Sequence, residues 1–190
     1  MISIEFIDQS QFETYDQIPM LVKVDSEYKL EKVQAGLGGI LLVEKPVEPY
    51  SKDLGQYARA TDLARQFDLS NWAFLMAYDA KTPVGGAIVV CQSPEINMLA
   101  GRKDLGVLWD IRVEQNHQAK GVGTMLFEHV TAWCKARELK QLKIECQNNN
   151  VAACKFYQKQ GASLGEINTY AYYLDAECAN ETQLIWYLDL

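Results

Sequence analysis

The sequence lacks the features that mark membrane, secreted and nucleic-acid-binding proteins. No apolar run approaches the ~20 residues that span a bilayer, and the first residues have no cationic start of a signal peptide. Basic residues are in deficit, with 18 Lys and Arg against 25 Asp and Glu and a net charge of −7, whereas nucleic-acid-binding domains are basic. We therefore expect a cytoplasmic protein with no membrane and no nucleic-acid partner. An acidic balance is compatible with a cationic ligand.

Cysteine and histidine are too few and too scattered to predict a disulfide framework or a metal centre. The five cysteines form an odd-numbered set without C-x-x-C spacing, and the two histidines are isolated. This pattern is typical of reduced thiols in a cytoplasm. We predict no metal and no disulfide among Cys91, Cys134, Cys146, Cys154 and Cys178.

The apolar pattern predicts an α+β fold on a mixed, mostly antiparallel sheet. A chain of 190 residues, 48% of them hydrophobic, can bury one core, so we expect residues 1–190 to form a single domain. Runs rich in β-branched and aromatic residues predict strands, and 3.6-residue periodicity predicts helices. The expected strands are 2–6, 28–33, 37–43, 72–78, 84–91, 108–113, 141–147, 163–174 and 183–188, and the expected helices are 9–20, 54–67, 124–137 and 149–160. Gly85-Gly86 suggests a β-bulge.

A glycine loop connects the strand 108–113 to the helix 124–137. Gly121 and Gly123 open the helix, and backbone N–H groups at such an entry are unpaired and lie at the positive end of the helix dipole. An anion such as a pyrophosphate fits there. By itself the loop is weak evidence, because glycine pairs precede helices in many unrelated turns. It also lacks the spacing of a nucleoside triphosphate loop or of a dinucleotide fingerprint.

The second informative segment runs from Asn150 to Gly161 and predicts a short, capped helix. Asn150 is a capping residue type, and Ala153 and Tyr157 are four residues apart, so they share one helical face. Taken alone, Tyr157 is explained at least as well as an ordinary core aromatic. The segment becomes specific because the pattern N-x-x-A-x-x-x-Y-x-x-x-G is filled at every fixed position and follows the glycine loop.

These two segments resemble the motifs of the GCN5-related N-acetyltransferase (GNAT) family. Gln118-x-x-Gly121-x-Gly123 is similar to the acyl-CoA loop of that family, and the segment 150–161 is similar to its second motif. The resemblance covers the chain from about Trp72 to the C-terminus.

Within that family, the sequence is similar to the streptothricin (nourseothricin) acetyltransferase group. The similarity lies in residues 43–49, in His-x-x-x-Gly-Val-Gly at 117–123, and in the tyrosine-rich segment 168–173. There are two departures from the family pattern. Gln118 stands where many relatives have arginine, which removes a positive charge near the phosphate, and Ala162 replaces the usual aromatic residue.

The resemblance implies a GNAT fold, in which helices flank a sheet that splays between the strands 108–114 and 141–147. It implies that acetyl-CoA binds in this cleft as co-substrate, without a metal. Loop amides would hold the pyrophosphate, strand main-chain groups would pair with the pantetheine arm, and the Tyr157 phenol would protonate the departing thiolate. The implied acetyl-CoA-binding residues are Ile111, Val113, Gln118, Ala119, Lys120, Gly121, Val122, Gly123, Thr124, Asn150 and Tyr157.

The attacking amine must be neutral, so a carboxylate is expected to take its proton. An unperturbed alkylammonium has a pKa of about 10.4, and a placed base is worth roughly 10²–10⁴-fold. Asp110 is the first candidate because it lies on the central strand, on the face opposite Ile111 and Val113. Glu145 on the neighbouring strand is the second candidate. Asp110 is explained equally well, and Glu145 better, as a solvated or salt-bridged strand carboxylate.

Aromatic and acidic residues are candidates for binding a cationic amine through ion pairing and cation–π contact. The alternative is that the tyrosines of the tail alternate between core and surface on a closing hairpin. The candidate amine-binding residues are Trp109, Asp110, Glu145, Tyr172 and Tyr173.

The sequence therefore predicts an acetyl-CoA-dependent N-acetyltransferase that acts on a primary amine of a small cationic molecule. The resemblance points to a streptothricin-type antibiotic, with resistance as the outcome. Another acceptor, such as a polyamine, an aminoglycoside or a protein amine, is the first alternative. A non-catalytic acyl-CoA-binding module is the second, and a homodimer is left open.

Overall fold

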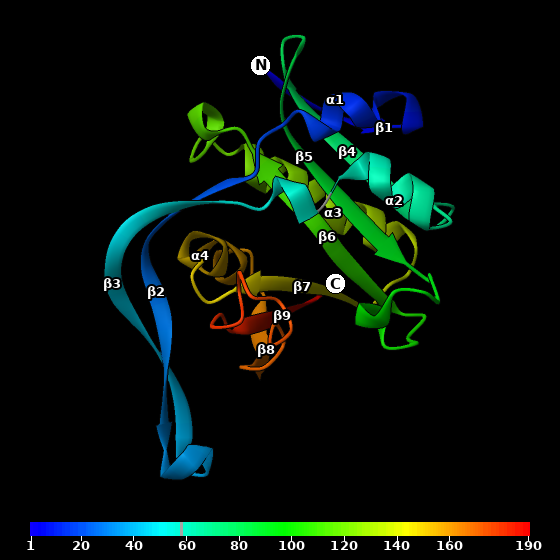
Figure 1. Ribbon diagram of the computed structural model, residues 1–190. Coiled ribbons are helices and arrows are strands. Elements are labelled where there is room, and N and C mark those ends of the chain that lie inside the picture. The colour runs from blue at the N-terminus through cyan, green and yellow to red at the C-terminus, as the bar shows by residue number, and fades with distance from the viewer. Residues whose placement is uncertain (58) are drawn as a thin grey trace. The chain divides into compact units, whose positions relative to one another are not determined.

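The computed structural model describes residues 1–57 and 59–190 and is a mixture of strands and helices (Figure 1). The strands are β1 (Ile2–Ile7), β2 (Leu21–Val33), β3 (Gly39–Asp53), β4 (Trp72–Asp79), β5 (Thr82–Cys91), β6 (Leu105–Val113), β7 (Gln141–Gln147), β8 (Ser163–Asn168) and β9 (Gln183–Asp189). The α-helices are α1 (Phe12–Asp16), α2 (Ala60–Gln66), α3 (Val122–Ala136) and α4 (Val151–Lys159). Short 3-10 turns are η1 (Gln9–Gln11), η2 (Gln34–Gly36), η3 (Gly55–Tyr57), η4 (Asn97–Leu99) and η5 (Gln115–His117).

The chain divides into two compact units. Unit 1 comprises Met1–Leu21, Asp53–Ile144 and Tyr187–Leu190, and unit 2 comprises Val22–Lys52 and Glu145–Trp186. The expectation that residues 1–190 form a single domain stays a prediction.

The predicted mixed, mostly antiparallel sheet is confirmed. Seven strands are ordered β1-β4-β5-β6-β7-β9-β8, and β2 and β3 form a separate two-stranded sheet. The neighbours from β1 to β6 pair antiparallel, whereas β6 and β7 pair parallel. The parallel pairing joins Leu105–Leu108 to Gln141–Ile144 and ends there, although β6 continues to Val113. This early end of the pairing is what the predicted splay between the central strands requires.

Helices pack on both faces of β5 in unit 1. A Cβ on Gly86 would collide with the ring of Tyr15 from α1, and a Cβ on Gly85 would lie 3.3 Å from Leu126 of α3. Because successive residues of a strand point to opposite faces, α1 and α3 lie on opposite sides of the sheet (Figure 1). The β4–β5 register shifts beside Gly85, where Val84 is the extra residue, so the predicted bulge is confirmed.

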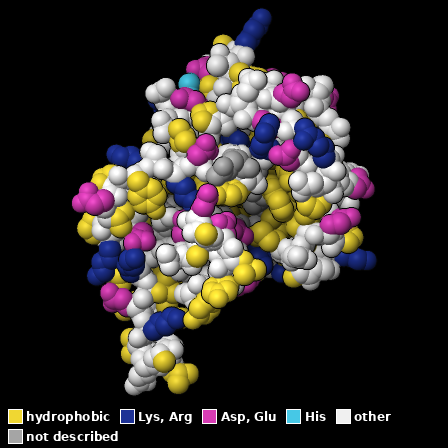
Figure 2. Space-filling model, in the orientation of Figure 1, with side chains coloured by type: hydrophobic (Ala, Val, Ile, Leu, Met, Phe, Trp, Pro, Cys, Tyr) yellow, Lys and Arg dark blue, Asp and Glu magenta, His cyan; other side chains and the backbone are white. Residues whose placement is uncertain are grey.

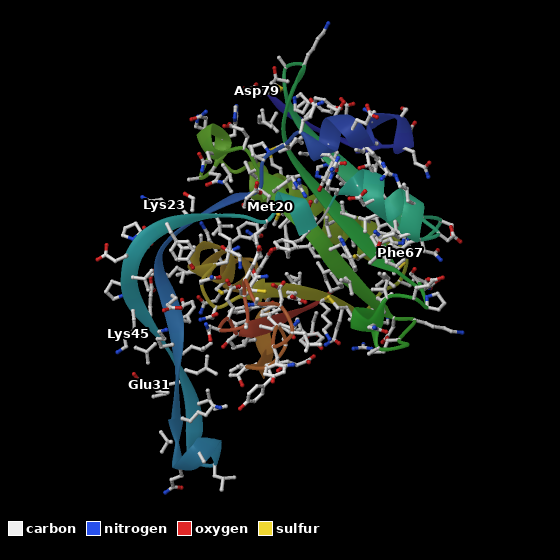
Figure 3. All side chains as sticks on the ribbon, in the orientation of Figure 1. Met20, Lys23, Glu31, Lys45, Phe67 and Asp79 are labelled. Atoms are coloured by element: carbon white, nitrogen blue, oxygen red, sulfur yellow. The ribbon has the colours of Figure 1, made fainter. Side chains whose placement is uncertain are left out.

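The hairpin expected around residues 34–36 is present, but its strands are much longer than 28–33 and 37–43. Together, β2 and β3 form a ribbon that includes the Pro46–Pro49 segment. Prolines fit because each strand of a two-stranded ribbon has an open edge. The Lys45 and Glu31 side chains pair across it at 3.5 Å (Figure 3). Polar residues occur on both of its faces, which hides the alternation that predicts strands.

Exposed apolar side chains gather at the tip of this ribbon (Figure 2). They are Val33, Leu37, Ile40 and Leu41.

Three further expected elements are wrong in length. The helix expected at 54–67 is η3 followed by the shorter α2, and residue 58 of that prediction lies outside the described residues. The helix expected at 9–20 is η1 followed by α1. The strand expected at 163–174 ends at Asn168, whose side chain accepts a hydrogen bond from the Tyr170 N–H at 2.9 Å. Such a turn removes the following tyrosines from the sheet. Across the described chain, no helix is long and apolar enough to cross a membrane.

Candidate active site

The loop between β6 and α3 is held in shape by its own side chains. The Glu114 carboxylate accepts a hydrogen bond from the Asn116 N–H at 3.0 Å and lies 2.8 Å from Nδ1 of His117. The side-chain amide of Gln118 donates to the Val113 carbonyl oxygen at 3.0 Å. Gln118 therefore braces the loop against the end of β6, and His117 serves as a loop residue.

The loop presents five consecutive backbone amides at the start of α3. Within the described residues, no hydrogen bond is found from an N–H group of the segment 119–123, whereas the Met125 N–H donates to the Gly121 carbonyl oxygen at 3.0 Å. Gly121 has φ +88° and precedes the first helical residue, and a Cβ there would meet nothing within 4 Å. These unpaired donors lie at the positive end of a 15-residue helix. The geometry fits a bound anion.

Strand β6 carries a second bulge that the sequence analysis missed. Asp110 is opposite Ile88, whereas Leu108 is opposite the next residue, Val89, so Trp109 is the extra residue. Beyond the bulge, burial alternates as predicted: Asp110 and Arg112 are buried, and the two residues expected to pair with pantetheine, Ile111 and Val113, are half-buried.

Asp110 is part of a buried ion pair. Its Oδ2 accepts hydrogen bonds from the Tyr15 hydroxyl at 2.6 Å and from Nε of Arg112 at 2.7 Å, and Nη1 of Arg112 donates to the Ile18 carbonyl at 3.1 Å. The side chains of Asp110 and Arg112 are 0% and 1% exposed. Burial raises the pKa of Asp110 and outweighs the opposing effect of Arg112. A carboxylate in this position has no exposed surface from which to take a proton from an amine.

The Trp109 indole packs against aromatic residues of unit 1. Its ring centroid lies 5.3 Å from that of Trp72 and 6.2 Å from that of Phe67. Trp109 is only partly buried, so its role in binding an amine stays a prediction.

In unit 2, the predicted cap of α4 is present. The Asn150 side chain accepts a hydrogen bond from the Ala153 N–H at 3.2 Å, and the helix spans Val151–Lys159. Tyr157 is 5% exposed, and its ring makes an edge contact with Phe156 at 5.5 Å. Tyr157 is thus largely buried, which fits a core aromatic as well as a phenol in a closed site.

The remaining amine-binding candidates, Glu145 of β7 and the tyrosines between β8 and β9, differ in their burial. The Tyr172 hydroxyl donates to Oε1 of Glu145 at 2.8 Å, and burial followed by the nearby carboxylate raises the pKa of that phenol. The Tyr173 side chain, in contrast, is 73% exposed. Glu145 and Tyr172 therefore form a partly buried pair that Tyr173 does not join through any described hydrogen bond.

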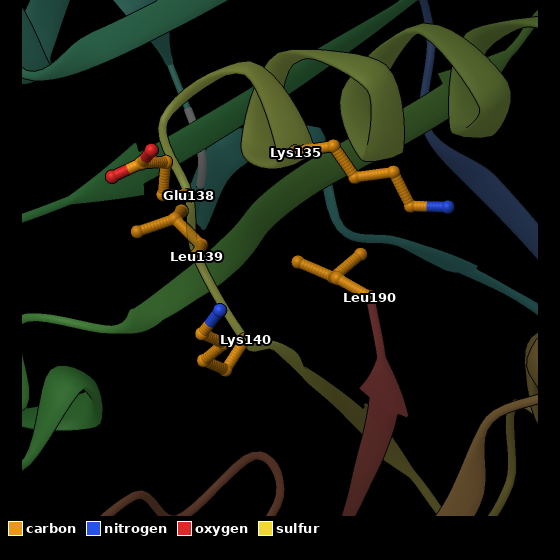
Figure 4. Close-up of a pocket in the computed structure, with 5 residues that line it drawn as sticks. All are labelled: Lys135, Glu138, Leu139, Lys140 and Leu190. Carbon is orange, nitrogen blue, oxygen red and sulfur yellow. The ribbon is translucent and has the colours of Figure 1, made fainter.

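A surface hollow of unit 1 lies at the opposite end of α3 from the glycine loop. It is lined by Lys135, Glu138, Leu139, Lys140 and Leu190 (Figure 4). At 1.5 Å per residue, the length of α3 places it about 20 Å from the loop. This hollow is not part of the candidate site. The described residues contain no group of three or more His, Cys, Asp or Glu side chains that could hold a metal ion.

Residues 41–162 match the model of the Acetyltransferase (GNAT) family. The chain belongs to the GNAT acetyltransferase family. Streptothricin acetyltransferase of Escherichia coli is 35% identical to this GNAT protein over 96 residues, which cover 47% of this chain and 55% of that protein. The chain thus spans about half the length of the curated relatives that it matches.

Solved structures share the fold of this GNAT protein. A candidate streptothricin acetyltransferase of Bacillus anthracis str. Ames, in complex with acetyl coenzyme A, has a TM-score of 0.78 and 22% identity, with 100% of both chains covered. Nourseothricin acetyltransferase has a TM-score of 0.78 and 21% identity, with 99% of this chain and 98% of that chain covered. The predicted GNAT fold is confirmed.

Sequence reasoning missed several buried polar residues of this GNAT protein. Arg112 and Tyr15 complete the surroundings of Asp110, and Asn148 and Asn149 are both 5% exposed. Arg112 was detectable as a second charge on the same strand face as Asp110. Tyr15 was not, because nothing local places residue 15 beside residue 110.

Proposed function

We propose that this GNAT protein transfers the acetyl group of acetyl-CoA to a primary amine of a small cationic molecule, with a streptothricin-type antibiotic as the preferred acceptor. The observation that carries the proposal is the row of unpaired amides at 119–123, at the start of α3. Family membership supplies the chemistry that such an anion site serves. The named relatives support the choice of acceptor.

In this proposal, the predicted acetyl-CoA-binding loop and strand and the Tyr157 phenol have separate tasks. The backbone amides of residues 119–123 bind the pyrophosphate, and Gln118, whose own N–H donates to the Gln115 carbonyl at 3.2 Å, holds the loop in place through its side chain. The main-chain groups of Ile111 and Val113 bind the pantetheine arm, beyond the point where β6 stops pairing with β7. The Tyr157 phenol donates a proton to the thiolate, which must be protonated as it leaves.

The two carboxylate candidates differ in their surroundings, and this difference supports Glu145 as the base. Asp110 is buried and already neutralised by Arg112, whereas Glu145 is half-buried and accepts a hydrogen bond from the neutral hydroxyl of Tyr172. We propose that Glu145 accepts the proton of the substrate ammonium and that Tyr172 orients its carboxylate. Asp110 then has a structural role, in which its hydrogen bonds with Tyr15 and Arg112 hold β6 in place.

The experiment is a measurement of thiol release from acetyl-CoA with a panel of amines. Turnover with streptothricin supports the proposal, and turnover only with a polyamine, an aminoglycoside or a protein amine moves the acceptor to that class. Thermal stabilisation by CoA without turnover on any amine would identify a binding module instead. No stabilisation by CoA and no turnover would contradict the proposal altogether.

The role of the loop is tested by Gly121→Ala with Gly101→Ala as its matched control. Both glycines have positive φ, +88° and +70°, and a Cβ on either would meet nothing within 4 Å. Each substitution is therefore expected to cost about 1–2 kcal/mol of stability through backbone strain alone. Only Gly121→Ala is expected to weaken CoA binding, by roughly tenfold, because relaxing that strain moves the amides. Isothermal titration with CoA checks this, and equal affinity of the two variants would rule out the loop as the phosphate site.

A further inference from the structure

Two buried asparagines form the turn between β7 and the Tyr157 helix. The Asn150 N–H donates to the Gln147 carbonyl at 3.0 Å, which places Asn148 and Asn149 at the two central positions of the turn. Both are only 5% exposed, although turn residues are usually at the surface. A buried amide side chain requires hydrogen-bond partners, and both asparagines have them.

Asn148 joins two other segments of unit 2. Its backbone N–H donates to the Thr182 carbonyl at 2.9 Å, and its Oδ1 accepts from the Thr182 N–H at 2.7 Å. On the other side, its carbonyl accepts from the Tyr28 N–H at 2.9 Å, and its Nδ2 donates to the Tyr28 carbonyl at 3.0 Å. Asn148 thus makes two hydrogen bonds to Tyr28 of β2 and two to Thr182, which directly precedes β9.

Asn149 joins β3 to the residue before Thr182 through its side chain. Its Nδ2 donates to the Tyr50 hydroxyl of β3 at 3.0 Å and to Oε1 of Glu181 at 2.9 Å. The ammonium group of Lys52 pairs with the same Glu181 carboxylate at 2.5 Å, and these two charged side chains are only 18% and 14% exposed. The negative charge of Glu181 is therefore neutralised inside the cluster.

We propose that Asn148 and Asn149 are positioning residues for Tyr157. Their contacts to both strands of the ribbon and to Glu181 and Thr182 form what we call the asparagine junction. The junction fixes the first turn of α4, which begins directly after it at the Asn150 cap. It also fixes the end of the segment between β8 and β9, in which the Tyr172 hydroxyl donates a hydrogen bond to Glu145. The inference rests on the proposed function, since Tyr157 matters only if acetyl transfer takes place.

The physical reason lies in the size of α4 and in the nature of the contacts. A helix of nine residues is marginal by itself, so its direction must come from tertiary contacts. Apolar contacts tolerate sliding, whereas a buried hydrogen-bond network is satisfied in few arrangements. A network at the N-terminal end of α4 sets the position of a phenol two turns further along that helix.

The test uses Asn149→Ala and Asn149→Asp, with Asn71→Ala as control. Asn71 also donates through Nδ2, to the Gln92 carbonyl at 3.2 Å, but it lies in unit 1. We expect Asn149→Ala to lower kcat by roughly 10- to 100-fold, as displaced catalytic groups do. Asn149→Asp is expected to lose at least as much, because its carboxylate would face that of Glu181. The dissociation constant of CoA should change less than twofold in all three variants.

A double-mutant cycle separates positioning from general stability. If Asn149 acts through Tyr157, Asn149→Ala should have little further effect on kcat once Tyr157→Phe is present. Additive losses in the double variant would overturn the proposal, as would an equal loss of kcat in Asn71→Ala.

Amide hydrogen exchange supplies a readout that needs no turnover. In Asn149→Ala, exchange should accelerate at residues 151–153 and 181–182 and stay unchanged at residues 85–90 of β5. Unchanged exchange at 151–153 would overturn the proposal even if kcat falls. If the unmodified protein acetylates none of the amines, the proposed function fails separately, and the exchange data still decide whether the junction orders α4.

Discussion

Replacing Tyr157 with phenylalanine is expected to lower kcat for acetyl transfer by roughly 10²–10⁴-fold, the range that a placed general acid contributes. The substitution removes only the hydroxyl and keeps the ring that contacts Phe156. A thiolate leaving without a proton is a poorer leaving group, so the loss should appear in kcat. The affinity for CoA should change little, because the unpaired amides of the loop are untouched. Thiol release with saturating amine and acetyl-CoA measures the effect.

Tyr78→Phe is the matched control for this prediction. The Tyr78 hydroxyl accepts a hydrogen bond from Gln11 at 3.2 Å in unit 1, so its loss also removes one phenol oxygen and one contact. We expect kcat of this variant to stay within a factor of two of the unmodified protein. A Tyr157→Phe variant as active as Tyr78→Phe would show that Tyr157 is a core aromatic and that another group protonates the thiolate.

Arg112→Ala is expected to destabilise the fold by about 3–5 kcal/mol, because it leaves the Asp110 carboxylate buried without its ion partner. Among the described residues, Oδ1 of Asp110 already has no hydrogen-bond partner, so in this variant the carboxylate keeps only the hydrogen bond from the Tyr15 hydroxyl. The variant also removes the donor to the Ile18 carbonyl, just before the start of β2. Urea unfolding followed by circular dichroism gives the change in free energy.

An exposed ion pair of similar geometry provides the comparison. Nε of Arg102 lies 2.9 Å from Oδ1 of Asp104, but the two side chains are 38% and 50% exposed. Arg102→Ala should therefore cost no more than about 1 kcal/mol. Removing both buried charges, as in Asp110→Asn with Arg112→Met, should recover part of the stability lost in Arg112→Ala. Equal costs for the two single arginine variants would show that burial of the Asp110 pair contributes nothing.

The predicted elements agreed with the structure where local patterns carry the information. The strands 72–78, 84–91 and 141–147 and the helices that became α3 and α4 match within a few residues, because continuous or periodic apolar residues mark them. The two ribbon strands were predicted too short because polar residues occur on both of their faces and hide the alternation that marks a strand. The strand expected at 163–174 was predicted too long, because a turn closed by the Asn168 side chain overrides the strand propensity of the tyrosines that follow.

In the candidate site, too, features set by neighbouring residues were predictable and features set by distant residues were not. The loop conformation at Gly121 and the cap at Asn150 were predictable, since each depends on a residue and its immediate neighbours. The exposure of a carboxylate was not, since it depends on residues distant in the chain. Asp110 is enclosed by Tyr15 and Arg112, and neither contact can be read from the neighbouring sequence of residue 110 alone.

The amino-acid sequence by itself determined the family, the glycine loop before α3 and the capped helix that carries Tyr157, because these features are encoded in short runs of residues. Only the tertiary structure decided which charges are neutralised and which segments are joined. Asp110 meets Tyr15 across 95 positions, and Asn148 meets Tyr28 across 120. Contacts of that kind form when the sheet and the ribbon fold, and no local pattern records them.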